Sequence, residues 1–295
     1  MVPANADAAG LVLSVSAACL MCSFNAGAEV YGENLEYIVC GNEVMVTGYK
    51  GEPVTLSIPT EINGKKVTQI RENAFYRCKS LKKVVIPEGV EIIGHHAFYE
   101  CGFLETAEIY GNLNKIAEGT FYGCSSLKNV ILPEGMDAVE NYGFYGCEKL
   151  RAVSLPDSVT RLGEYSFADC KILETVQLPE SLVDVETCAF LRCDSLSGIE
   201  IPVSVMQIGN FSFGFSGEEN PVPVEKFVIS GSKNSLGETY AKQNHFAFEN
   251  AEKEDSRERN FYIPGILIAS SATGLLILKI TEKAAGFRLK YEYET

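Results

Sequence analysis

The chain has 295 residues, of which 46% are hydrophobic and 22% charged, so it can bury a sizeable core and is not a disordered acidic tail. It carries 25 Lys and Arg against 39 Asp and Glu, and the net charge of −14 is spread along the chain. Nucleic-acid binding requires clustered cations, so we expect no nucleic-acid partner. The sequence contains three histidines and no phosphate-loop or nucleophile motif. We therefore assign no cofactor, no metal site and no catalytic residue, and we expect a protein that is not an enzyme.

Residues 1–28 are predicted to be a signal peptide. The run 8–22 is apolar, and Ala26, Gly27 and Ala28 supply the small-x-small pattern at which signal peptidase cuts. Asp7 precedes the run at a place where positive charge is usual, so the sequence leaves the true start codon open. The rest of the chain would lie outside the cytoplasm.

Residues 29–58 are predicted to form an N-terminal β cap and the first strand. Two apolar runs, 35–40 and 44–49, flank the turn 41–43, which is typical of a β-hairpin. Such a hairpin would cover the first coil of the region that follows and protect its strand edges.

The region 59–216 repeats every 23 residues. A phenylalanine recurs at this interval seven times, and a cysteine follows it three residues later in the first six units. We interpret these positions as structural ladders: Phe75, Phe98, Phe121, Phe144, Phe167, Phe190, Phe213, Cys78, Cys101, Cys124, Cys147, Cys170 and Cys193. A period of this length with regularly spaced leucines predicts a leucine-rich-repeat solenoid.

Each coil is expected to contribute one short parallel strand and, on another wall, a second short strand or a turn. Val84 and Ile86 alternate as in a strand, and Pro87 ends it because proline has no N–H to give to the ladder. Val90 and Ile93 form a second apolar pair on another wall. One coil cannot bury its apolar side alone, so neighbouring coils must stack. The predicted fold is a right-handed solenoid of mainly short parallel β-strands.

Residues 217–250 are predicted to supply the last strand and a C-terminal cap. The segment 235–244 has Ser235 at a plausible N-cap position and indicates a closing helix.

The chain then changes character. Residues 251–260 form a charged linker, and 261–278 are 18 uncharged, mostly apolar residues that predict one transmembrane helix. A buried helix of a soluble domain is the alternative. Residues 279–295 would be a short cytoplasmic tail, and its four cations fit the positive-inside rule. We expect a single-pass cell-membrane protein with extracellular repeats.

The repeat units at 74–81 (AFYRCKSL) and 120–127 (TFYGCSSL) resemble the BspA-like family of bacterial and protist cell-surface leucine-rich repeats. The resemblance covers about residues 30–250 and includes the period, the Phe, the Cys and the Ile-Pro pair. It implies an extracellular adhesion or protein-binding module. It carries over no ligand residue, because that family has no fixed binding motif.

Both ladders admit a functional interpretation. Six aligned thiols could bind a metal or act in redox chemistry, and seven aligned rings could form a ligand platform. We favour packing for both, because cysteine behaves as a small hydrophobe and side chains that point the same way make poor disulfides.

The candidate binding face consists of polar side chains between the inward positions of the first strand in each coil. Its members are Lys82, Lys83, Glu105, Glu108, Lys128, Asn129, Arg151, Ser154, Glu174, Gln177 and Glu200. Repeat proteins commonly bind on such extended faces. The charges here are mixed in sign, and a merely solvated face is the alternative.

The function we expect is that of a membrane-anchored cell-surface protein that binds a protein or extracellular-matrix ligand non-covalently, in adhesion or recognition. The alternative is an architectural cell-envelope protein without a dedicated ligand. Loss of binding on charge reversal at Lys128 and Arg151 would favour the first.

Overall fold

The computed structural model describes residues 29–32, 34–217 and 220–251, together with the backbone of 260–263, 266–271 and 274–279. The chain divides into two compact units, Met1–Ala251 and Glu252–Thr295. The predicted signal peptide, most of the charged linker and nearly all of the predicted tail lie outside the described residues.

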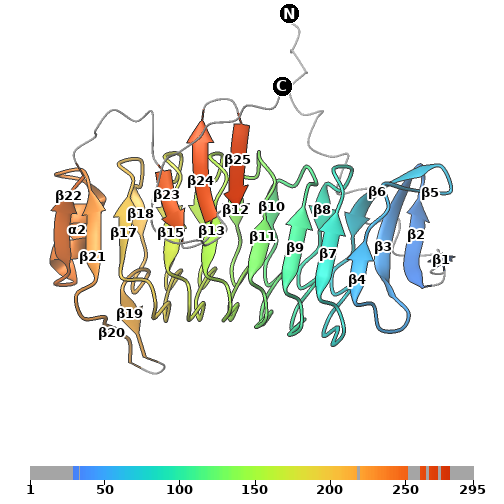
Figure 1. Cartoon of the computed structure of the whole chain (residues 1–295), viewed down its shortest axis with the longest axis horizontal. Coiled ribbons are helices and arrows are strands. Elements are labelled where there is room, and N and C mark those ends of the chain that lie inside the picture. The colour runs from blue at the N-terminus through green and yellow to red at the C-terminus, as the bar shows by residue number, and fades with distance from the viewer. Residues whose placement is uncertain are drawn as a thin grey trace, which may run out of the picture. The chain divides into compact units, whose positions relative to one another are not determined.

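The first wall of the solenoid is formed by the strand that each coil contributes before its proline position. In the described chain these strands form three sheets whose neighbours pair in parallel, and between regular coils the shift is one repeat, so that Lys83 lies beside Thr106 and Thr106 beside Asn129. The strands stand side by side in chain order (Figure 1). They are β4 (Thr55–Ser57), β7 (Lys83–Ile86), β9 (Thr106–Ile109), β11 (Asn129–Ile131), β13 (Ala152–Ser154), β15 (Thr175–Gln177), β17 (Gly198–Ile201), β21 (Val228–Gly231) and β22 (Ala247–Asn250).

The second wall is formed by the second apolar pair of each coil. Its strands are β6 (Lys65–Ile70), β8 (Ile92–Ile93), β10 (Lys115–Ile116), β12 (Ala138–Val139), β14 (Arg161–Leu162), β16 (Asp184–Val185) and β18 (Gln207–Ile208). The pairs β10–β12, β12–β14, β14–β16 and β16–β18 are all parallel. The second apolar pair, for which the sequence left a strand or a turn open, therefore forms a two-residue strand in these coils.

A third wall carries the phenylalanine column and is built from tight turns. The N–H of Phe98 donates to the carbonyl of Thr120 (3.0 Å), and the N–H of Phe121 donates to Gly143 (2.9 Å), so each turn is tied to the next coil. Positive φ angles occur two residues before and two residues after the ring, as at His96 (58°) and Glu100 (52°). Most residues pay a steric cost in this left-handed conformation.

The core is a continuous stack of rings. Consecutive phenylalanines from Phe75 to Phe213 stack with centroids 5.1–5.5 Å apart and interplanar angles of 19° or less. The six rings from Phe98 onward are almost completely buried. The ladder is therefore a packed spine, as the sequence predicts, and its rings do not form a surface platform.

At the N-terminal end, the expected hairpin is present as β2 (Leu35–Cys40) and β3 (Glu43–Tyr49), which pair antiparallel. β1 (Glu29–Tyr31) adds to β2, and β5 (Glu61–Ile62) turns back onto β6. Because β3 pairs in parallel with β6, the hairpin extends the second wall.

At the C-terminal end, the expected helix is present as α2 (Leu236–Gln243), and the Ser235 hydroxyl accepts from the N–H of Glu238. The helix is not the last element of the stack, because β22 follows it and pairs in parallel with β21. The sequence predicts that the helix closes the stack, but a further strand follows it. A small hairpin, β19 (Phe215–Ser216) and β20 (Val222–Pro223), occupies the insertion before β21.

The predicted transmembrane helix over 261–278 is wrong for the described residues. They form three antiparallel strands, β23 (Asn260–Ile263), β24 (Ile266–Ser271) and β25 (Gly274–Lys279). Among the described residues, no helix has the length and apolar character needed to cross a bilayer. Pro264 stands inside the run, where a helix would lose a hydrogen bond, and Ile- and Leu-rich segments separated by glycine suit short strands.

Candidate functional site

The predicted binding face lies along the first wall, where the solenoid joins its charges in pairs. Lys128 Nζ lies 2.7 Å from Glu105 Oε2, Lys83 Nζ lies 2.6 Å from Glu108 Oε1, and Arg151 Nε lies 3.5 Å from Glu174 Oε1. The partners sit on adjacent coils.

The hydrogen bond from Lys128 lowers the pKa of Glu105. Asn129, Ser154 and Gln177 are exposed on their strands. Pairs of this kind are exposed to water and contribute little to stability. Six charged members of the predicted face therefore lie in ion pairs that neutralise one another.

The cysteine column has a structural role in the described coils. Cys124 Sγ donates to the carbonyl of Phe98 (3.2 Å), and Cys147 Sγ donates to that of Phe121 (3.4 Å). Each thiol thus satisfies a carbonyl of the preceding coil. Burial raises the pKa of Cys101 to about 12 and that of Cys124 well above its usual value, which makes these thiols poor nucleophiles and metal ligands. No group of His, Cys, Asp or Glu that could hold a metal occurs among the described residues.

A second aromatic ladder runs beside the phenylalanine spine, and the sequence analysis missed it. Tyr76, Tyr99, Tyr122 and Tyr145 each follow a spine phenylalanine, and their rings stack at 5.1, 4.5 and 4.7 Å. The signal was available, because these tyrosines share the 23-residue spacing. Burial, more than any other factor, raises the pKa of Tyr145 to about 12.

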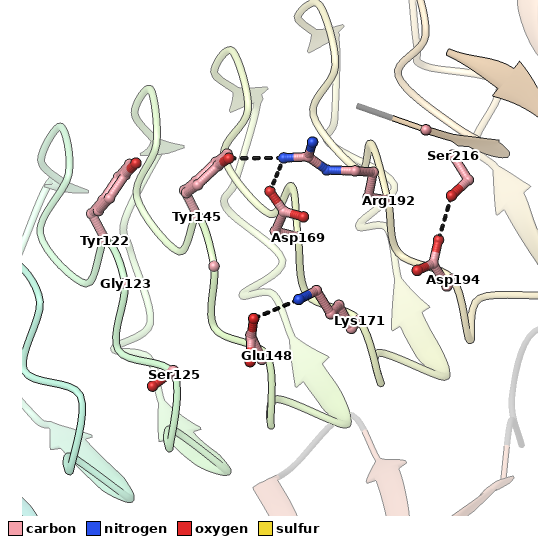
Figure 2. Close-up of a pocket in the computed structure, with 12 residues that line it drawn as sticks. Tyr122, Gly123, Ser125, Tyr145, Glu148, Asp169, Lys171, Arg192, Asp194 and Ser216 are labelled. Atoms are coloured by element: carbon pink, nitrogen blue, oxygen red, sulfur yellow. Dashed lines mark hydrogen bonds and ion pairs between the residues drawn. The ribbon is translucent and has the colours of Figure 1, made fainter. Parts of the chain in front are cut away.

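The tyrosine ladder forms one side of a hollow of about 570 Å³ in the third wall. The lining comes from the same two or three positions of successive coils: Tyr122, Gly123, Ser125, Tyr145, Gly146, Glu148, Asp169, Lys171, Arg192, Asp194, Ser216 and Gly217. We call this hollow the tyrosine groove. Figure 2 shows its side chains extending from adjacent turns.

Two glycines account for the depth of the groove. Gly123 and Gly146 occupy the left-handed position two residues after the ring, with φ of 67° and 69°. In other coils the same position carries a long side chain, for example Arg77, Glu100 and Arg192. The absence of side chains on two neighbouring coils opens the space next to Tyr145.

Paired polar groups line the other sides. The Arg192 guanidinium bonds both the carboxylate of Asp169 and the hydroxyl of Tyr145, the latter at 2.8 Å. Lys171 Nζ lies 2.6 Å from Glu148 Oε1 (Figure 2). Arg192 Nε is buried and has no hydrogen-bond partner in the described part of the chain. Paired hydrogen-bond donors and acceptors and an aromatic wall therefore line the groove.

The fold and the surface define the class of protein. Coils of constant length, two walls of short parallel strands and a ring-stacked turn constitute a leucine-rich-repeat solenoid, and its groove and paired faces suit non-covalent contact. The chain belongs to the BspA-type family: the model of the "BspA type Leucine rich repeat region" matches residues 56–172 and 137–241, in six copies.

Solved structures give the same fold. The chain is similar to a leucine rich cell surface protein from Faecalibacterium prausnitzii, with a TM-score of 0.61 and 25% identity over 85% of this chain and 60% of that one. It is also similar to a leucine-rich repeat protein from Bacteroides ovatus, with a TM-score of 0.54 and 23% identity over 77% of this chain and 66% of that one. The chain spans less than two thirds of either protein. No curated protein matches it.

Proposed function

We propose that this chain is a cell-surface recognition protein that binds a protein or extracellular-matrix ligand non-covalently, with the tyrosine groove as its principal contact. Family membership and the cell-surface description of the Faecalibacterium prausnitzii protein support the location. A helical membrane span is not part of the proposal.

The observation that carries the proposal is the break in the periodic surface at Gly123 and Gly146. On the first wall, charges such as Lys128 and Glu105 already satisfy one another. In the groove, an aromatic wall and the paired polar groups of Arg192–Asp169 and Lys171–Glu148 surround an open space. Concave sites with a few placed polar groups bind ligands better than flat, self-neutralised faces do.

The test is adhesion of the purified chain to immobilised extracellular matrix, measured with the wild type and with Gly146→Arg. Arg77 and Arg192 occupy the same position of their coils with φ of 57° and 60°, so an arginine fits this backbone conformation. Filling the groove should weaken binding by about ten-fold or more, because a hot-spot cavity is lost.

The control is the double charge reversal Lys128→Glu with Arg151→Glu on the first wall. We expect this variant to bind within about two-fold of the wild type, since it changes only exposed charges on the first wall and none of the residues that line the groove. If the control variant lost binding and Gly146→Arg retained it, the ligand-binding site would lie on the first wall and not in the tyrosine groove. Absence of matrix binding by the wild type would favour an architectural role in the envelope.

A further inference from the structure

Tyr145 is the last ring of the tyrosine ladder, and among the described residues one of its faces has no ring stacked on it. On one side it stacks on Tyr122 at 4.7 Å with an interplanar angle of 12°. At the equivalent position of the next coil stands Ala168, which is buried and has no ring. Tyr142 and Tyr165 contact Tyr145 edge-on, at 5.9 Å and 65° and at 6.5 Å and 62°. The groove therefore contains an aromatic face that can stack on a flat apolar surface of a ligand.

The charged groups around this face are arranged as pairs. Glu148 and Asp169 each face a cation, Lys171 and Arg192, and the third carboxylate, Asp194, accepts from the Ser216 hydroxyl at 2.7 Å. Asp169 bonds Arg192 and Glu148 bonds Lys171, so an added anion or cation would meet a like charge beside each partner. The pairs nevertheless keep unused lone pairs and N–H donors. Hydroxyl groups, which both donate and accept, match such pairs best.

The backbone of the groove is less suited to a peptide. The N–H of Gly123 donates to the carbonyl of Tyr145 at 2.7 Å, and the N–H of Gly146 donates to Ala168 at 2.8 Å. These groups are committed to the next coil and cannot extend a ladder to an added strand. Recognition of an extended peptide by strand addition needs a free edge.

From these observations we infer that the tyrosine groove binds a neutral sugar ring of a glycan. The apolar face of the pyranose stacks on the open face of Tyr145, and its hydroxyls bond the Arg192–Asp169 and Lys171–Glu148 pairs. This inference deepens the proposed function and rests on it, because it specifies which part of a matrix ligand the groove recognises.

The experiment is titration of the full chain with neutral oligosaccharides of β-linked glucose, N-acetylglucosamine and galactose and of α-linked mannose, read by saturation-transfer NMR and calorimetry. At least one of these probes should bind, and Tyr145→Ala should weaken it by about ten-fold or more. Tyr145→Phe keeps the ring face and should retain most of the affinity. The matched control is Tyr76→Ala at the opposite end of the ladder, which should bind within about two-fold of the wild type.

Gly146→Arg provides a second variant if Tyr145→Ala fails to fold, and it should also abolish sugar binding. Periodate, which cleaves the vicinal diols of sugars, should abolish binding of the wild type to the matrix. Equal affinity in wild type, Tyr145→Ala and Gly146→Arg, or no neutral probe bound, overturns the inference. If matrix binding survives periodate but remains sensitive to Gly146→Arg, the groove binds a peptide: the proposed function then stands and the sugar does not. Binding of only a heparin oligosaccharide would likewise overturn it.

Discussion

Phe144 shows how a single residue holds two coils together. Its ring stacks on Phe121 at 5.3 Å and on Phe167 at 5.1 Å, and the side chain is fully buried. Phe144→Ala should reduce the free energy of unfolding by about 3–5 kcal/mol, because it leaves a cavity between two coils. Denaturant titration of Phe103→Ala is the control: Phe103 is 56% exposed, so its loss should cost less than about 0.5 kcal/mol. If both substitutions reduced the free energy of unfolding equally, Phe144 would not be part of a packed spine.

The cysteines make a second prediction at this scale. Cys124, Cys147 and Cys170 are buried and bond backbone carbonyls, whereas Cys78 is partly exposed. Among these four thiols, an alkylating reagent at pH 8 should modify Cys78 first and reach the others only after unfolding. Peptide mass mapping of the modified sites gives the order. Rapid labelling of Cys147 in the folded chain would refute the structural role of the column.

Single positions were predictable where they point inward. A spine phenylalanine such as Phe121 recurs because each coil meets the same neighbour, so periodicity alone finds it. Tyr145 shares that periodicity, but whether a ring facing outward is exposed, stacked or beside a hollow depends on the residues of the next coil. That information lies in three-dimensional contacts such as the one from Arg192 to the Tyr145 hydroxyl.

At the scale of the element, the ring-bearing turn depends on its two left-handed positions. Gly146 has φ of 69°, and a Cβ there would lie 3.6 Å from the nearest atom outside its neighbours, so only the backbone conformation opposes a side chain. Gly146→Ala should lower the free energy of unfolding by about 1–2 kcal/mol. Gly102 has ordinary backbone angles and an equally open Cβ position. Gly102→Ala should leave stability unchanged or raise it slightly, and thermal melts of the pair measure the difference.

Strands could be predicted from the sequence where the same residue pattern recurs in each coil. The strands of the first wall follow from an alternating apolar pattern seen in coil after coil, whereas the apolar pair of the second wall left a strand or a turn open. The segment 261–278 occurs once, and its high hydropathy is compatible with either a helix or strands. Pro264 and the flanking glycines favour strands. The final strand β22 was missed because its sequence, AFEN, has little apolar character.

At the scale of the whole molecule, the stacked core links stability to pH. Burial raises the pKa of Tyr240 and Tyr145 to about 12, from an ordinary value near 10, and that of Cys101 to about 12 from near 9. The unfolded chain therefore loses these protons at lower pH than the folded chain does. Their contribution to stability is complete below about pH 9 and is lost as the pH rises toward 12.

Urea denaturation at several pH values checks this dependence. The midpoint should fall steadily above about pH 9. Tyr240→Phe should make the fall shallower between about pH 10 and 12, because one of the shifted groups is removed. Tyr110→Phe, at an exposed tyrosine, is the control and should leave the slope unchanged. A midpoint that stays constant up to pH 12 would contradict a core that keeps these groups protonated.

We propose that ligand contact takes place at the tyrosine groove, where two glycines interrupt an otherwise regular surface. Hydrogen–deuterium exchange of the full chain with and without the matrix ligand locates the contact. We expect slower exchange at the groove turns 122–125, 145–148, 169–171 and 192–194, with no change on the first-wall strands. Slower exchange confined to strands such as β9 and β11, with the groove turns unaffected, would contradict it.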